Sequence, residues 1–117
     1  MSHPARLRWV ALVGALTGER RVAHTEGFPL EPEKMLPVAD VVLVVPDDGG
    51  AMLFRYTAHG DFGGDTWHAN VGDAQEQAAY EYGDALDAWI EVPSEVTDPH
   101  AYAVRYAYER LDKRGGW

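Results

Sequence analysis

The stretch that decides the fold is VADVVLVVPDDGGAMLFRYTAHGDFGGDTWHAN, which covers residues 38–70. Residues 38–45 are almost entirely apolar, and this predicts a central strand that is buried on both faces. Residues 46–50 are a turn signal, because Pro, Asp and Gly follow one another there. Residues 51–58 alternate in the manner of a second strand, and a glycine-rich turn leads into a third, short strand over 65–70. The stretch therefore predicts an antiparallel meander of three strands.

The segment before the meander has two interpretations. Residues 7–16, LRWVALVGAL, have the β-branched and aromatic content of a buried strand, and residues 20–25 could return as its antiparallel partner. A short amphipathic helix over 5–16 is the alternative, although Gly14 and the lack of an N-cap residue count against it. The three prolines of residues 27–37 predict a packed connecting loop.

A first helix is predicted directly after the meander. Asn70 has the side chain of an N-cap residue, and Gly83 is placed to end the helix. The residues at helical spacing that should face the core are Val71, Ala74, Ala78 and Tyr82.

A short strand over 88–92 and a second helix complete the chain. Asp98 is the expected N-cap of this helix, and Pro99 suits its first position. Its predicted core stripe is Ala101, Val104, Tyr108 and Leu111. We therefore expect one domain over 1–117 of the α+β class, with a mainly antiparallel sheet of five or six strands and two helices packed on one face.

Charge is the feature that bears most on function. The chain has a formal net charge of -9, and Arg55 is the one basic residue between 35 and 104. Such a surface repels nucleic acid and attracts basic proteins, so we expect no nucleic-acid partner. There is no cysteine and no apolar run long enough for a membrane helix, so we expect a cytoplasmic protein with no membrane contact.

One loose cluster could bind a metal ion. His59, Asp61, Asp65 and His68 lie within ten residues, and imidazole and carboxylate groups are ligands for Zn²⁺ or Mn²⁺. The spacing follows no fixed signature, so a glycine-rich turn whose Asp residues bond their own backbone is the favoured interpretation. Thr66 and His68 should share a strand face, since alternate residues point the same way.

The chain also resembles a recurring pattern. The residues that carry it are Gly64-Asp65-Thr66-Trp67-His68, then Ala74, Gln77, Ala78, Glu81, Tyr82 and Gly83, and finally Trp89 and Val92-Pro93. The pattern is similar to that of small uncharacterised bacterial proteins with a Thr-Trp-His strand and a Gln- and Glu-rich helix that ends in Glu-Tyr-Gly. The resemblance implies no activity, substrate or cofactor.

Four residues are the predicted binding residues. Trp67 is expected in the core, and His68 would then face outward, where nearby carboxylates would favour its protonated form. Glu81 has no evident structural role, and Tyr102 and Tyr106 lie one turn apart outside the expected core stripe.

We therefore expect a small acidic non-enzymatic binding or regulatory protein that acts on a basic protein partner and needs no cofactor. The alternative is a metal-binding protein or metal-dependent enzyme that uses the His/Asp cluster at 59–68. A homodimer is a further expectation, since residues 38–45 could leave a partner surface exposed.

Overall fold

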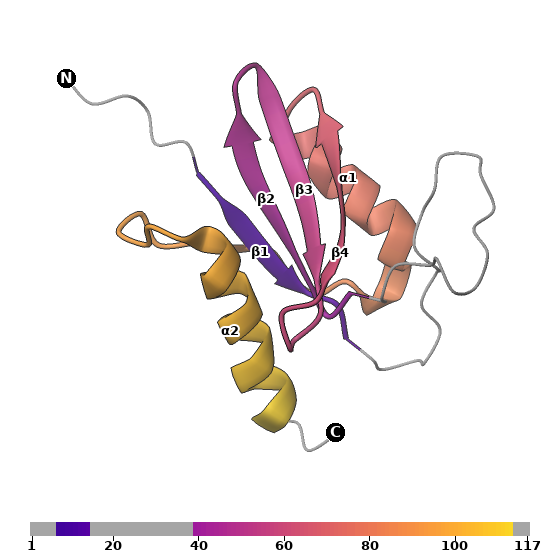
Figure 1. Ribbon diagram of the computed structural model, residues 1–117. Helices are drawn as coiled ribbons and strands as arrows, with labels where there is room; N and C mark the ends of the chain where they lie inside the picture. The colour runs from indigo at the N-terminus through magenta and orange to yellow at the C-terminus, as the bar shows by residue number, and fades with distance from the viewer. Residues whose placement is uncertain (1–6, 15–38, 114–117) are drawn as a thin grey trace.

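The structure is a computed structural model that describes the backbone of residues 7–14 and 39–113 and the side chains of the same residues up to 110. Five strands form one antiparallel sheet in the order β4-β3-β2-β1-β5 (Figure 1). Their bounds are β1 Trp9–Leu12, β2 Val41–Asp47, β3 Gly50–Tyr56, β4 Phe62–His68 and β5 Ile90–Glu91. The predicted meander is confirmed as β2, β3 and β4.

The strand interpretation of the first segment is confirmed over β1, which pairs with both β2 and β5. The predicted return strand over 20–25 and the connecting loop over 27–37 lie outside the described residues.

Glycines shape the first turn of the meander and the pairing of its second and third strands. A two-residue turn, Asp48-Gly49, joins β2 to β3, and Gly49 has a φ of 75°, which glycine adopts without strain. In the pairing of β3 with β4 the register slips, so that Gly63 and Gly64 both lie opposite Arg55. This β-bulge gives Gly64 a φ of 106°.

Helix α1, Val71–Tyr82, begins and ends where the sequence predicts. The Asn70 side chain accepts a hydrogen bond of 2.8 Å from the backbone N–H of Asp73. Gly83 follows the helix at a φ of 53° and opens a short 3-10 turn, η2, Gly83–Ala85. Ala74, Ala78 and Tyr82 are buried, so the predicted apolar stripe of α1 is confirmed.

Helix α2, Pro99–Lys113, is also capped as predicted, because the Asp98 side chain accepts hydrogen bonds from the backbone N–H groups of His100 and Ala101. Its core stripe, however, was predicted wrongly. Ala103 and Ala107 are fully buried, whereas Ala101 and Tyr108 are exposed. Helix α2 has two apolar stripes. The stripe with the smaller side chains, Ala103 and Ala107, faces the sheet, because small side chains allow the helix to pack closest to it.

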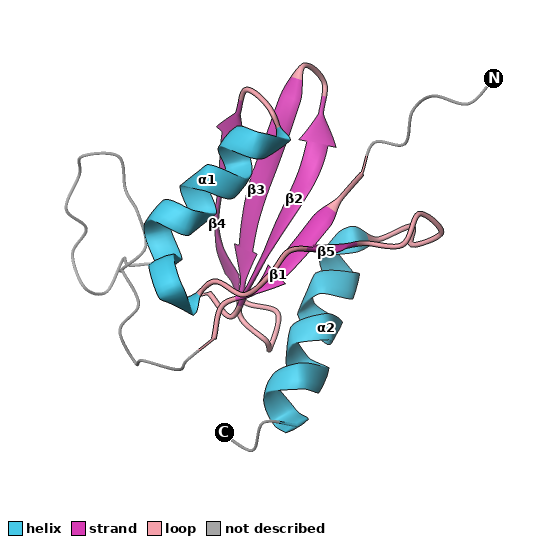
Figure 2. Ribbon diagram, turned by 180° about the vertical axis from the view of Figure 1, so that it is seen from behind, coloured by secondary structure: helices cyan, strands magenta, loops and turns pink. Residues whose placement is uncertain are grey.

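The two helices cover opposite faces of the sheet, as the front and back views show (Figures 1 and 2). Alternate residues of β1 and β2 divide between two cores. The core under α1 includes Ala11, Val42 and Val44, and the core under α2 includes Val10, Val41 and Leu43. The α+β class, the antiparallel five-stranded sheet and the two helices are as expected, but the placement of both helices on one face is wrong. The reason is that β1 and β2 are apolar on both sides, so each face needs a cover.

The same arrangement buries most of the described strand that was expected to leave a dimer surface exposed. The described part of the predicted strand, Val41 onward, lies in the middle of the sheet between β1 and β3. Val41, Val42, Leu43 and Val44 have no accessible surface. These four residues are therefore paired on both edges and covered on both faces, whereas Val45 is partly exposed.

The two helices cover the sheet unequally, and this difference decides which part of the sheet stays exposed. The core under α1 reaches from β1 to β3, whereas the fully buried strand residues of the core under α2 come from β1 and β2, and Phe54 and Tyr56 of β3 pack only at its edge. Neither of the two described helices therefore lies directly over the face of β3 and β4 that looks away from α1 (Figure 1). Among the described residues, no helix is long and apolar enough to cross a membrane.

Candidate functional site

The half of the sheet left open by α2 presents an apolar surface, which we call the aromatic face. It consists of Met52, Phe62 and Trp67, together with Val45, Phe54 and Tyr56, which are partly buried against the edge of the core under α2. Their strand neighbours Val44, Ala51 and Leu53 point to α1 instead. Trp67 is 55% exposed and Phe62 is 48% exposed. Large apolar side chains of an edge strand are rarely left in water, so their exposure together indicates a contact surface.

Trp67 is held against the sheet by a glycine. A Cβ added to Gly50 would overlap the indole ring of Trp67, so the ring lies directly over the glycine backbone. Gly50 pairs with Asp47 at the end of the β2–β3 hairpin. The indole is therefore fixed in place although more than half of its residue surface is open to water.

Helix α2 closes one side of the aromatic face through His100. Its ring meets the Phe54 ring edge-on with centroids 4.5 Å apart, and its Nδ1 lies 2.6 Å from the Tyr56 hydroxyl. Between α2 and this end of β3 there is an open hollow of about 550 Å³. Its lining is mostly apolar and aromatic, and includes His59, Val104 and Tyr108.

Carboxylates surround the aromatic face. Asp65 is exposed beside Phe54, and Asp98 is exposed at the start of α2. Burial raises the pKa of Tyr56, and the negative charges of Asp98 and Asp65 raise it further. Asp47 follows Val45 on the same face of β2 and is exposed as well. We call Asp47, Asp65 and Asp98 the acidic rim.

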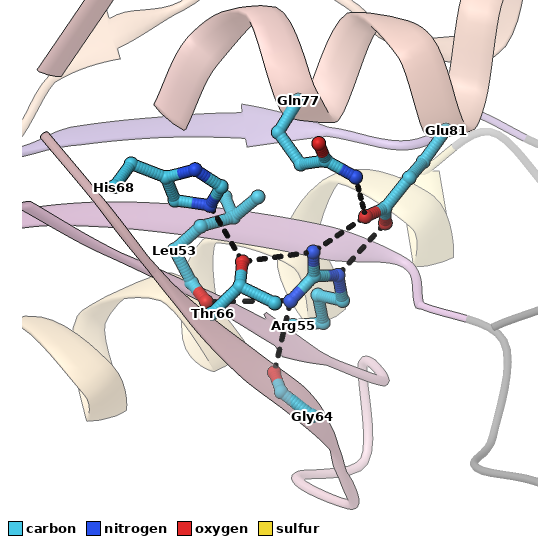
Figure 3. A network of polar contacts seen from close by, with 7 residues as sticks. All are labelled: Leu53, Arg55, Gly64, Thr66, His68, Gln77 and Glu81. Atoms are coloured by element: carbon cyan, nitrogen blue, oxygen red, sulfur yellow. Dashed lines mark hydrogen bonds and ion pairs between the residues drawn. The ribbon is translucent and has the colours of Figure 1, made fainter. Parts of the chain in front are cut away.

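The opposite face of β3 and β4 contains a buried ion pair (Figure 3). Arg55 of β3 donates two hydrogen bonds to Glu81 of α1, from Nε to Oε1 at 2.8 Å and from Nη2 to Oε2 at 2.6 Å. Both side chains are 5% exposed. Burial lowers the pKa of Arg55, but the hydrogen bonds and charge of Glu81 more than offset this, so the net pKa is raised.

Further groups complete the network around this pair. Gln77 donates to Glu81 Oε2 at 2.7 Å, and Arg55 Nη2 donates to Thr66 Oγ1 at 3.2 Å. The bulge turns the Gly64 carbonyl to Arg55 Nη1 at 3.5 Å. The network ties α1 to both β3 and β4, and it therefore fixes the strands that carry the aromatic face.

His68 belongs to this inner side, contrary to the prediction. Its Nε2 lies 2.6 Å from Thr66 Oγ1, which confirms that the two side chains share a strand face. Trp67 points to the opposite face and is exposed, so the expected order of a buried Trp67 and an outward His68 is reversed. Since Arg55 donates to Thr66 Oγ1, the threonine hydroxyl can donate its proton to His68 Nε2.

Glu81, a predicted binding residue, pairs with Arg55. The hydrogen-bond network, and not a ligand, therefore accounts for its buried carboxylate. Tyr102 and Tyr106 stack on each other with centroids 6.1 Å apart, and the Arg110 guanidinium lies 3.7 Å from the Tyr106 ring centre. Helical geometry places these tyrosines on the flank of α2 opposite to His100 and Val104. None of the four predicted binding residues therefore lies on the aromatic face.

The predicted metal ligands are not brought together. In the turn before β4 the Asp61 carboxylate accepts a hydrogen bond from the Thr57 hydroxyl, whose oxygen in turn accepts from the backbone N–H groups of His59 and Asp61, so it is Thr57 rather than the expected Asp that bonds the turn backbone. Asp65 and His68 point to opposite faces of β4. Within the described ranges, which include all four residues, no three His, Asp or Glu side chains are arranged to hold a metal ion.

Sequence reasoning missed Arg55 and Gln77 as partners of Glu81 and Thr66 as a partner of Arg55, and it placed Trp67 in the core. One signal could have pointed to the ion pair: a lone Arg in a long acidic stretch, next to Leu53 on an alternating strand, needs a carboxylate partner if its face of the strand is buried. No local signal revealed that the face of β4 bearing Trp67 lacks a helix.

Comparisons of the chain with protein-family models, with curated proteins and with solved structures find no match. The resemblance to small bacterial proteins with a Thr-Trp-His strand stays a prediction.

Proposed function

We propose that this protein is a small non-enzymatic binding protein that holds a basic segment of a partner protein on the aromatic face. The observation that carries the proposal is the joint exposure of Trp67 and Phe62 on the open half of the sheet. Tryptophan is enriched among the residues that dominate the energy of protein interfaces.

Charge supports the choice of a basic partner. Asp65 lies on the same face of β4 as the exposed rings of Trp67 and Phe62, and the whole chain has a net charge of -9. Lysine or arginine side chains can bind a carboxylate and the face of an indole ring at the same time. Like-charge repulsion disfavours an acidic partner at the same surface.

The Arg55–Glu81 network supports the same proposal in a different way. It fixes β3 and β4 against α1, so the rings on the other face are presented on a rigid support. A preorganised surface loses less conformational entropy when a partner binds. The absence of cysteine is our one reason to place this activity in the cytoplasm.

Calorimetric titration with two synthetic peptides tests the proposal. One peptide alternates Lys and Val over the length of β4, and the other alternates Glu and Val. We expect the Lys peptide alone to bind, and we expect Trp67→Ala to weaken its binding roughly tenfold or more, as loss of an interface tryptophan does. Ile90→Ala removes an exposed apolar side chain from the other edge of the sheet and is the matched control.

A second comparison isolates the charge. Asp65→Asn should weaken the Lys peptide and reduce the salt dependence of its affinity, whereas Glu76→Gln, on the exposed side of α1, should leave both almost unchanged. Failure of the Lys peptide to bind, or equal affinity of the Trp67→Ala variant and the unchanged protein, would refute the proposed function.

A further inference from the structure

Strand β4 forms one edge of the sheet, and no described strand lies beyond it. An edge strand presents backbone N–H and C=O groups that can pair with another chain. The aromatic side chains of β4, Phe62 and Trp67, stand next to this edge.

The register determines which backbone groups of β4 point outward. The two-residue turn makes Asp47 and Gly50 a hydrogen-bonded pair, so the alternate residues of β3 from Gly50 onward bond to β2. Ala51 and Leu53 then bond to their partners in β4, His68 and Thr66. The backbone groups of Asp65 and Trp67 are consequently directed to the open edge.

The same two residues carry side chains of the aromatic face. In an antiparallel pair, directly opposed residues project their side chains to the same face. A strand added along β4 would therefore place alternate side chains beside the Asp65 carboxylate and the exposed Trp67 ring. Both groups attract cations.

Charge also argues against a second copy of this chain as the added strand. Antiparallel pairing of two β4 strands would bring the carboxylate of Asp65 close to its counterpart, and each copy has a net charge of -9. Like charges that face each other across two strands are destabilising. A basic segment would instead place positive charges opposite the Asp65 carboxylate, and opposite charges across two strands are stabilising.

We propose that the basic partner segment binds as an extended antiparallel strand along the open edge of β4, with its Lys or Arg side chains on the aromatic face. This inference rests on the proposed function and specifies how the partner is held. Binding thus combines main-chain hydrogen bonds to Asp65 and Trp67 with side-chain contacts to the Asp65 carboxylate and the Trp67 ring.

Backbone methylation of the Lys-Val peptide tests the strand geometry without altering the protein. Lysines on the aromatic face direct their own N–H groups to β4, whereas the valine N–H groups point away. A peptide with N-methylated lysines should bind roughly tenfold or more weakly, the effect of losing about two main-chain hydrogen bonds. A peptide with N-methylated valines has the same charge and the same number of aromatic contacts, and should bind almost as well as the parent.

The outcomes separate the two proposals. If both methylated peptides bind like the parent, or both lose affinity equally, strand addition is wrong while the binding function stands. If the parent peptide itself does not bind, the proposed function is refuted, and the strand proposal that rests on it is refuted as well. Loss confined to the lysine-methylated peptide supports addition of a strand to β4.

Discussion

At the scale of the residue, Arg55 has the clearest structural role. It is the one base in a long acidic stretch, and its guanidinium is buried against Glu81 with both oxygens engaged. Two buried charges are costly to remove from water, and this cost is recovered only while both partners are present. The pair therefore stabilises the contact of α1 with the sheet only as a unit.

Replacing one partner should therefore lower the free energy of unfolding far more than replacing both. We expect Arg55→Leu or Glu81→Leu alone to lower the free energy of unfolding by about 3–5 kcal/mol, since a buried charge is left unpaired. The double variant should recover most of this loss. Urea denaturation of the four proteins measures the coupling between the sites.

The exposed pair of α2 provides the control for that cycle. Arg105 and Glu109 lie 3.4 Å apart, but their side chains are 81% and 52% exposed. Replacing both with Leu should change the free energy of unfolding by less than about 1 kcal/mol. Additive losses at Arg55 and Glu81 would contradict our view of them as a unit.

At the scale of the element, α1 and α2 show when the spacing of apolar residues predicts the buried face of a helix and when it does not. Helix α1 has one stripe of apolar residues, and that stripe is buried as predicted. Helix α2 has apolar residues on several sides, and the stripe that includes Tyr108 faces the hollow rather than the sheet. This stripe of α2 and Tyr56, at one end of the aromatic face, line the same hollow.

A charge placed under α1 tests the packing of that helix. Ala78 has no accessible surface and belongs to the core between α1 and the sheet. Ala78→Asp should lower the free energy of unfolding by several kcal/mol, about 3 or more, because it buries an unpaired carboxylate.

Glu76→Ala is the control on the same helix, because Glu76 is exposed. Its effect should stay within about 0.5 kcal/mol. Thermal melting of the two variants is the measurement, and similar losses at both sites would mean that the buried face of α1 is assigned incorrectly.

At the scale of the whole molecule, the two faces of the sheet have different chemistry. The face under α1 holds a buried ionic network, and the other face exposes rings beside carboxylates. Tyr82 lies on the first face and Tyr56 on the second. Burial raises the pKa of each hydroxyl above its ordinary value of 10.0, and the charge of Glu81 adds to the effect at Tyr82.

This predicts a loss of stability in alkaline solution. In the unfolded chain these tyrosines ionise near pH 10.0, whereas the fold keeps them protonated to higher pH. The stability that they contribute is therefore complete below pH 10.0 and is lost as the pH rises through their folded pKa values.

Urea denaturation at a series of pH values above 9 measures this slope. Tyr82→Phe removes the hydroxyl and should make the slope shallower, whereas Tyr108→Phe, at an exposed position, should leave it unchanged. An unaltered slope in Tyr82→Phe would show that the tyrosine does not cause the alkaline loss.

The sequence by itself determined the elements with local causes. The Asp-Gly turn and the alternating strands set the meander, and Asn70, Gly83 and Asp98 set the helix ends. These signals act between residues that are near one another in the chain. The net charge and the clustering of the acidic residues could also be determined from the sequence, since they depend only on which residues are present and in what order.

Only the tertiary structure decided what each face of the sheet meets. Alternation shows that Trp67 and His68 point in opposite directions, but it does not say which direction leads to a helix. The choice depends on how α1 and α2 pack against strands that are apolar on both sides. That same packing paired Arg55 with Glu81, 26 residues away, and left Trp67 at an open edge.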